Sequence, residues 1–434
     1  MKKESLKRQA LITACCGALV RAMGFGLRLW ISRLLGAEAM GVMELASGAH
    51  MLALTPAAAG LPSAVSRLTA KAENREQRQL TLYAGRQMAA WMGLCITPLF
   101  LFLSPLLANF LGDGRTLPAL VFFAPCVLTV GLSSVYDGYF FGQGKALPPA
   151  LSEGAEQVVR LAVVGFLAFL VPRVTVAYRA ALPAVASTLG EAAGLAVILA
   201  IAGRVPSFRH DARLPGVRKK LFSLSLPLLL NRLCHTGLRS LCGVIIPLRL
   251  MAVGLGKAEA LSRLGMFSGM TMPLMFLPCL LSGALAAVGG PAMARCKTKQ
   301  AENRLVFRLL SASAGTGLLC AAGLYMFAPY ISRLFYRLPE LTPLLRASAP
   351  LAVLLPVQQT ASGIMTGLGL QKRSLAAGLI GAAATLLCTW QWTPAHGIYG
   401  AARASMAGHG LTLFCELAAL ALRREMRQGA SSAP

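Results

Sequence analysis

Long apolar segments recur along the whole chain, and they limit what it can fold into. About 20 apolar residues in a helix, rising 1.5 Å per residue, cross the roughly 30 Å hydrocarbon core of a bilayer. Twelve segments of about 20 to 30 residues meet this requirement, at 11–35, 41–66, 80–109, 117–141, 148–171, 178–203, 221–246, 264–290, 305–330, 343–368, 374–393 and 397–422. Backbone groups in lipid must be hydrogen-bonded within the segment, so each one is expected to be helical. The sequence therefore predicts an all-α polytopic membrane protein with 12 transmembrane helices.

The charged residues are distributed as in a membrane protein. Only 13% of the 434 residues are charged, against about 25% in soluble domains, and 56% are hydrophobic. The net charge of +26 could indicate nucleic-acid binding, but the basic residues form short clusters between apolar segments. With a cytoplasmic N terminus, 24 basic residues, including Arg295 and Lys297, fall in cytoplasmic segments and 10 in external ones. The positive-inside rule then predicts a multi-pass cell-membrane protein with both termini cytoplasmic and no nucleic-acid partner.

Arginines inside the apolar segments include two pairs with the same spacing. Arg21 and Arg28 lie in the first segment, and Arg232 and Arg239 lie in the seventh. Seven residues are close to two helical turns, so each pair shares one face of its helix. A central arginine costs about 2.5 to 3.5 kcal/mol in lipid. These faces are therefore expected to meet a bundle interior, a water-filled cavity or an anionic partner.

Short motifs also repeat in the two halves of the chain, in the same order. Ala-Glu-Asn-Arg follows the second segment at 72–75 and the eighth at 301–304. Glycine-rich turns end the fourth segment at 142–145 and the tenth at 367–372. These matches predict a parallel repeat of six helices, related by a pseudo-two-fold axis along the membrane normal. The expected divisions are an N-terminal six-helix lobe at 1–203, a basic cytoplasmic linker at 204–220 and a C-terminal six-helix lobe at 221–434.

Arginine pairs at equivalent positions of two facing lobes predict a cationic cavity. Guanidinium groups bind phosphate through two parallel hydrogen bonds, and such contacts are strong in surroundings of low dielectric constant. The predicted ligand is a phosphate or diphosphate, and its predicted binding residues are Arg21, Arg28, Arg232 and Arg239. The secondary candidates for the same cavity are Asp137, Arg160 and His235.

The alternative is that the arginines neutralise buried carboxylates. The acidic residues that could serve as partners are Glu44, Asp137, Glu153, Glu156, Glu191 and Glu416. Glu156 and Arg160 are four residues apart on one helix, so we expect them to pair with each other. His235 lies three and four residues from Arg232 and Arg239, where it could share their cavity or simply pack within the bundle.

No pattern typical of an enzyme or a metal site occurs in the sequence. The 11 cysteines and 5 histidines are scattered, without CxxC or another metal-ligand spacing. GxSxG and HExxH are absent, and Gly-Gln-Gly-Lys at 142–145 lacks the GxxxxGK[ST] spacing of a phosphate loop. We therefore expect a protein that is not an enzyme and that uses no cofactor or metal.

Seven short runs of residues, in a fixed order, resemble one family of membrane proteins. The runs are Val20–Phe25, Arg33–Gly41, Gly60–Arg67, Gly138–Gly144, Glu156–Arg160, Gln358–Gly369 and Gly397–Ala402. With them the chain resembles the stage V sporulation protein B and polysaccharide exporter family of the multidrug/oligosaccharidyl-lipid/polysaccharide (MOP) flippase superfamily, and it is similar to lipid II flippases. The resemblance implies a two-lobed exporter that moves lipid-linked sugars across the membrane by alternating access.

In the similar lipid II flippases, arginines on the first helix and at the start of the second lobe line the cavity. That pattern corresponds to Arg21 and Arg28 here, and to Arg232 and Arg239. The chain departs from the pattern in length, because such flippases often have fourteen helices and twelve are predicted for this chain.

The leading hypothesis is a monomeric flippase for a lipid-linked oligosaccharide or peptidoglycan precursor, a polyprenyl diphosphate sugar, in spore-cortex or cell-wall synthesis. Its partners would be this lipid-linked substrate and the surrounding membrane lipids. One alternative is a cation-coupled multidrug exporter of the same superfamily, for which we would expect an acidic residue in the first helix rather than arginines. A second alternative is a morphogenetic membrane protein that transports nothing.

Overall fold

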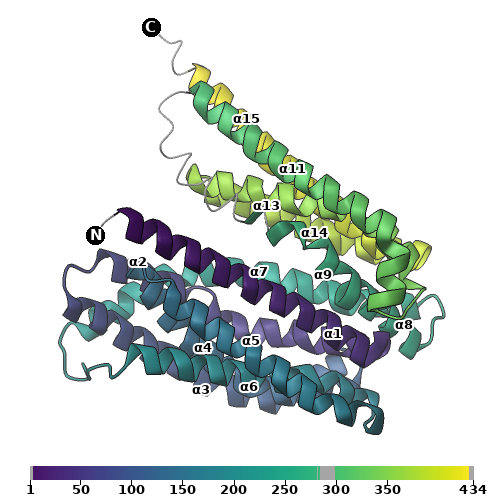
Figure 1. Cartoon of the computed structure of the whole chain (residues 1–434), viewed down its shortest axis with the longest axis horizontal. Helices are drawn as coiled ribbons and strands as arrows, with labels where there is room; N and C mark the ends of the chain where they lie inside the picture. Colours follow the sequence, from purple (N-terminus) through teal and green to yellow (C-terminus); the bar gives the residue numbers. More distant parts are fainter. Residues whose placement is uncertain (1–2, 281, 284–298, 430–434) are drawn as a thin grey trace. The chain divides into compact units, whose positions relative to one another are not determined.

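The computed structural model describes residues 3–280, 282–283 and 299–429, and these form helices joined by short turns, without a β-strand among them. Contacts between Cα atoms divide the chain into two compact units, Met1–Ser240 and Leu241–Pro434. We call these unit 1 and unit 2 and describe each by itself (Figure 1).

Unit 1 is a bundle of long helices. These are α1 (Lys3–Ala58), α2 (Leu61–Lys71), α3 (Arg75–Phe110), α4 (Leu117–Gly142), α5 (Leu147–Leu167), α6 (Val176–Ala202) and the part of α7 (Leu214–Met251) that ends at Ser240. Two short 3-10 segments, η1 (Gly114–Thr116) and η2 (Ala168–Arg173), lie at the ends of α4 and α5. α4 packs against α1, α2, α3 and α6, while α5 packs against α1 and α6. The charged side chains of α1, α4, α5 and α6 can therefore meet inside one bundle.

A glycine turn divides α1 into two antiparallel arms. Gly36 has φ 76° and ψ 173°, a conformation that is essentially restricted to glycine. Arg28 and Glu44, which lie at equal distances in sequence before and after Gly36, form an ion pair. A pair with this spacing requires the second arm to run back beside the first. The turn falls between the predicted membrane segments 11–35 and 41–66.

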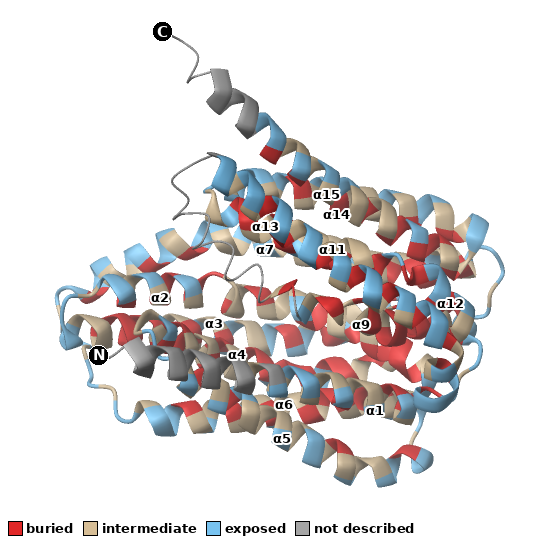
Figure 2. Cartoon of the chain, turned by 45° about the horizontal axis from the view of Figure 1, so that its top comes forward, coloured by how far each residue is buried: buried red, intermediate tan, exposed pale blue. Residues whose placement is uncertain are grey.

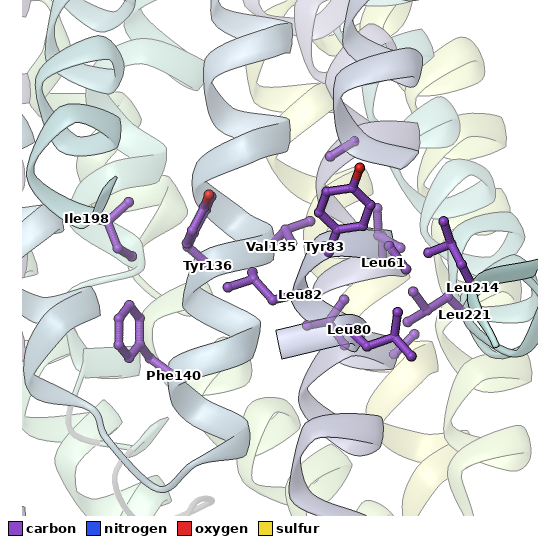
Figure 3. Packing of buried hydrophobic residues seen from close by; sticks show 14 residues of the cluster. Leu61, Leu80, Leu82, Tyr83, Val135, Tyr136, Phe140, Ile198, Leu214 and Leu221 are labelled. Atoms are coloured by element: carbon purple, nitrogen blue, oxygen red, sulfur yellow. The ribbon is translucent and has the colours of Figure 1, made fainter. Parts of the chain in front are cut away.

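α2 is held against α4 by a close backbone approach and by the main core of unit 1. Gly138 of α4 contacts the backbone of Pro62, and a Cβ at this glycine would overlap it. Leu61 of α2, Leu82 of α3 and Tyr136 of α4 are each at most 2% exposed and belong to one apolar cluster (Figure 3). Burying a large apolar side chain stabilises a fold by about 1.5 to 3 kcal/mol, so this cluster fixes the positions of α2, α3 and α4.

Unit 2 contains shorter and more irregular helices as well as long ones. After the end of α7 follow α8 (Lys257–Leu264), the π-helical η3 (Gly265–Thr271), α9 (Met272–Met275), α11 (Lys299–Tyr330), the π-helical η4 (Ile331–Phe335), α12 (Leu341–Ser348), α13 (Leu351–Gly367), α14 (Gln371–His396) and α15 (Ile398–Gly429). α12 and α13 meet at an angle of 40°. α11 packs against α13, and α15 packs against both α13 and α14.

Small residues bring α14 and α15 into backbone contact. A Cβ added at Gly408 would lie 2.6 Å from the carbonyl oxygen of Gly381, and one added at Gly381 would lie 2.5 Å from that of Gly408. The hydroxyls of Thr385 and Thr412 occupy the remaining space beside these glycines. Membrane helices commonly associate through small residues in this way. Lipid is as apolar as the helix surface, so the hydrophobic effect does not hold the helices together, and close packing does.

The described residues contain seven helices that are long and apolar enough to cross a membrane, or eight if the bent pair α12–α13 is one span. The seven are Arg75–Phe110, Gly114–Gly142, Leu147–Arg173, Val176–Ala202, Gln300–Phe335, Gln371–His396 and Ile398–Leu422. Both units carry many exposed large apolar side chains, for example Phe102 at 82% and Leu319 at 76% exposed. Exposed positions recur along the helices of the chain (Figure 2). A surface of this kind suits lipid, and the predicted all-α polytopic membrane fold is confirmed.

Two further predictions about the architecture stay predictions. These are the number of twelve helices and the division into lobes at 1–203 and 221–434 with a linker at 204–220. The eighth predicted segment, 264–290, ends outside the described residues, and Arg295 and Lys297 also lie outside them.

The predicted linker packs against unit 1. Val205, Phe208 and Val217 contact the main apolar cluster of this unit. Nearby, Arg213 pairs with Asp211 at 2.7 Å and also with Glu76 of α3. The hydrogen bond from the Arg213 guanidinium holds the pKa of the Asp211 carboxyl below its ordinary value.

Candidate functional site

Arg28 on the first arm of α1 pairs with Glu44 on the second arm. One terminal nitrogen of its guanidinium donates to a carboxylate oxygen of Glu44. The Arg28 side chain is 38% exposed, and its buried Nε has no acceptor among the described residues. The guanidinium is therefore partly neutralised and retains donors for a further anionic group.

Arg21 lies two helical turns before Arg28, on the same arm of α1, and its side chain is exposed. It interacts electrostatically with the Glu153 carboxyl group of α5. Among the described residues it has no carboxylate at ion-pair distance, so its guanidinium is available to a ligand.

Arg160 of α5 is at the centre of a part-buried three-residue ion cluster. It forms an ion pair with Glu156 at 2.6 Å, one helical turn away, and donates a hydrogen bond to Glu191 of α6 at 2.7 Å. Gly190 makes room for this arrangement, because a Cβ at that position would lie 2.5 Å from Arg160 Cγ. The predicted Glu156–Arg160 pair is confirmed. Arg160 is thereby engaged by two carboxylates instead of standing free in a cavity.

Asp137 of α4 lies at the wall of a cavity of about 440 Å³ in unit 1. Its Oδ1 is shielded from solvent and has no hydrogen-bond partner among the described residues. Asp137 interacts electrostatically with Glu153 and Glu156, which lie on α5. α4 and α5 of unit 1 thus carry several carboxylates close to one another, and only some of them are paired with arginine.

Arg232, His235 and Arg239 lie on the part of α7 that belongs to unit 1. Ser240 donates a hydrogen bond of 2.9 Å to the Gly48 carbonyl of α1, which fixes this part of α7 against the second arm of α1. Both arginines are exposed, and the half-buried His235 interacts electrostatically with each of them. In the described part of the chain, neither arginine has a carboxylate at ion-pair distance.

The four arginines that are predicted to bind a diphosphate thus differ in whether the structure gives them a carboxylate partner. Arg28 has a carboxylate partner, which is the arrangement the neutralisation hypothesis requires. Arg21, Arg232 and Arg239 have none among the described residues, which leaves their fork-shaped guanidinium groups available for a phosphate. The roles of all four in binding stay predictions.

The sequence named Glu44 and Glu191 as acidic residues that could pair with the arginines, but it did not show which arginine each of them meets. Glu44 is brought to Arg28 by the turn at Gly36, and Glu191 is brought to Arg160 by the packing of α5 on α6. Gly190, next to Glu191, is the one local sequence feature that could have indicated the Arg160–Glu191 pair, because a small residue leaves room for a long side chain from a neighbouring helix.

The fold defines the class of this protein. An inward-facing multidrug resistance MATE family transporter of the MOP superfamily matches 95% of this chain and 96% of its own, with a TM-score of 0.75 and 16% sequence identity. The lipid II flippase MurJ in an inward closed conformation matches 94% of this chain and 87% of its own, with a TM-score of 0.73 and 14% identity. The chain therefore has the fold of MOP-superfamily transporters.

Sequence comparison then defines the family. Residues 6–297 match the polysaccharide biosynthesis protein family, and the chain belongs to it. The chain is also similar to stage V sporulation protein B of Bacillus subtilis (strain 168), with 29% identity over 427 residues, which cover 94% of this chain and 82% of that protein. These findings confirm the family expected from the seven sequence runs.

Proposed function

We propose that this protein is a flippase that translocates a polyprenyl diphosphate sugar, either a lipid-linked oligosaccharide or a peptidoglycan precursor, across the cytoplasmic membrane. The observation that carries the proposal is the presence of exposed arginines on α1 and α7 without carboxylate partners in the described part of the chain, in segments that the sequence predicts to cross the membrane: Arg21, Arg232 and Arg239. Such charges are costly in lipid and are retained where they have a function. Membership of the polysaccharide biosynthesis family and the fold shared with MurJ support the same substrate class.

In the proposed mechanism, the arginines bind the diphosphate while the prenyl chain stays in lipid. Twelve helices form two six-helix lobes, at 1–203 and 221–434, which rock about a pseudo-two-fold axis and expose the headgroup to each side in turn. Both termini are cytoplasmic, and the protein works as a monomer in the cell membrane. Spore-cortex or cell-wall synthesis is the process that the similarity to stage V sporulation protein B supports.

Arg28 has a distinct part in this mechanism because it begins the cycle paired with Glu44. An arriving diphosphate competes with the Glu44 carboxylate for the partly exposed guanidinium. When the diphosphate leaves, Glu44 pairs with Arg28 again. The carboxylate thus prevents an unpaired charge from remaining in the empty transporter.

A cation-coupled exporter is the second candidate, and one observation favours it. Asp137 and Glu191 lie inside unit 1 among other carboxylates, and the fold also matches that of a multidrug transporter. Exporters of cations need interior carboxylates, whereas a diphosphate carrier needs interior arginines. The two candidates therefore differ in the sign of the charge that carries transport.

The test is a translocation assay on the full chain in proteoliposomes, with a polyprenyl diphosphate carrying an N-acetylhexosamine as the probe. The double substitution Arg28→Ala and Arg239→Ala is expected to abolish translocation while the protein still inserts and folds. Lysine at both positions should restore part of the rate, because it keeps the charge and loses the two-pronged geometry. Arg33→Ala, a substitution of another exposed arginine on α1, is the matched control and should transport normally.

Normal translocation by the Ala double variant would refute the proposed function. A wild-type protein that leaves this lipid in place but extrudes an organic cation, with loss of extrusion in Glu191→Gln, would support the cation-coupled exporter instead.

A further inference from the structure

The cavity beside Asp137 is distinct in chemistry from the arginine pairs. It has a volume of about 440 Å³, which lies within the range of small-molecule sites in proteins. Its walls come from α2, α4 and the end of α1, and neither arginine pair lines it. The side chains that give the cavity its chemical character are Ser63, Ser66, Arg67, Ser134, Asp137 and Phe141.

These side chains form two stripes on facing helices. On α2, Ser63 and Arg67 are four residues apart, which places them on one face. On α4, Ser134, Asp137 and Phe141 follow at intervals of three and four residues, which also places them on one face. The close contact between Gly138 and Pro62 holds the two helices together beside the cavity. The polar groups therefore line one open cavity between two helices that are in backbone contact.

Hydrogen-bonding capacity remains unused in this space. Asp137 lines the cavity and its carboxylate accepts bonds only; no described residue donates to it, and its Oδ1 is shielded from solvent. Ser134 donates to the carbonyl of Gly131 at 3.0 Å, so its lone pairs remain available as acceptors. Arg67 supplies donors only, and no ion pair joins it to Asp137 among the described residues.

The balance of charge separates this cavity from an anion site. One carboxylate and one guanidinium together carry no net charge, whereas the arginine pairs are cationic. A ligand that satisfies both groups must offer donors and acceptors close together and needs no charge of its own. Sugar hydroxyls both donate and accept hydrogen bonds and carry no charge. The exposed ring of Phe141 also offers an apolar surface to the C–H face of a pyranose.

We propose that this cavity binds a sugar ring of the transported headgroup, with Asp137 and Arg67 as the residues that recognise its hydroxyls. The inference rests on the proposed flippase function and extends it. The arginine pairs hold the diphosphate, which all such lipids share, and the cavity between α2 and α4 distinguishes headgroups. With cytoplasmic termini, the cavity lies toward the cytoplasmic ends of α2 and α4, where a headgroup made in the cytoplasm would enter.

The test is competitive binding to the full chain in detergent, measured by native mass spectrometry. One probe is sugar-free polyprenyl diphosphate, and the other is the same lipid carrying an N-acetylhexosamine. The wild-type protein is expected to prefer the sugar-bearing lipid by roughly tenfold or more, the difference that a hydrogen bond to a charged group provides. Asp137→Asn should reduce this preference toward equality and leave binding of the sugar-free lipid unchanged.

A matched pair of serine substitutions separates recognition from folding. Ser134→Ala alters the cavity and should weaken the preference for the sugar-bearing lipid, whereas Ser133→Ala alters the buried neighbour outside the cavity and should not. Asp137→Asn should not lower the unfolding temperature, since Oδ1 has no partner to lose in the described residues.

The outcomes distinguish this inference from the function on which it rests. If the wild-type protein binds both lipids equally, or if Asp137→Asn keeps the full preference, the sugar site is wrong and the flippase proposal stands. If neither lipid binds to the wild-type protein, the flippase proposal fails.

Discussion

Substitution of Arg160 by glutamine should destabilise unit 1 strongly. The side chains of Arg160, Glu156 and Glu191 are only 22%, 15% and 16% exposed, so the cluster is a part-buried ion network and not a surface pair. Removing one partner of a buried pair costs about 3 to 5 kcal/mol, because the remaining charge is left without compensation. Here Arg160→Gln leaves two carboxylates facing each other, and partial exposure favours the lower figure, about 3 kcal/mol.

This free energy corresponds to a measurable shift in the unfolding temperature. For a cooperative unit of 240 residues, about 3 kcal/mol lowers the midpoint by roughly 6 to 12 °C. The assay is thermal unfolding of the purified full chain at one scan rate, followed by tryptophan fluorescence. Trp30 of α1 is a suitable reporter because its ring approaches Gly165 of α5, close to the cluster.

A neutral version of the cluster provides the control. When Glu156→Gln and Glu191→Gln are added to Arg160→Gln, no buried charge remains, and amide side chains can hydrogen-bond with one another. The triple variant should therefore recover most of the lost stability. An Arg160→Gln protein that unfolds at the wild-type temperature, or a triple variant as unstable as the single one, would refute the reasoning.

Two further predictions concern a surface ion pair and a helix contact. The pKa of Asp211 is lower in the folded protein than in the unfolded chain, so its pairing with Arg213 contributes stability above the unfolded pKa, near 4, and this contribution is lost as the pH falls through the lower folded value. Arg213→Ala should make the unfolding temperature less dependent on pH between about 2 and 5, and an unchanged pH profile would contradict this. In unit 2, Gly408→Ala forces a Cβ against Gly381 and should destabilise the α14–α15 contact by about 1 to 3 kcal/mol, measured by thermal unfolding. Gly410→Ala, which has open space around it, should be close to neutral, and equal effects of the two substitutions would show that the contact is not tight.

Interactions within one helix were the part of the structure most accessible from sequence. The Glu156–Arg160 pair follows from helical periodicity alone, because residues four apart always meet on the same face. The helical character of the chain follows similarly from the length and hydropathy of its apolar segments.

Interactions between helices could not be predicted in the same way. Glu191 reaches Arg160 only because α6 packs on α5 in one particular register, and apolar side chains on both helices would allow others. The cavity beside Asp137 likewise depends on the crossing of α2 and α4 at Gly138. A single sequence contains no record of which helix faces meet, so the candidate site could be predicted as a set of residues but not as an arrangement.

Binding of a polyprenyl diphosphate lipid to the four arginines is the central claim. Its most direct test is native mass spectrometry of the full chain titrated with sugar-free polyprenyl diphosphate. The wild-type protein is expected to bind this lipid, and alanine at Arg21, Arg28, Arg232 and Arg239 together should remove the bound lipid, while Arg33→Ala should retain it. Equal binding by the wild-type and four-alanine proteins would contradict the account.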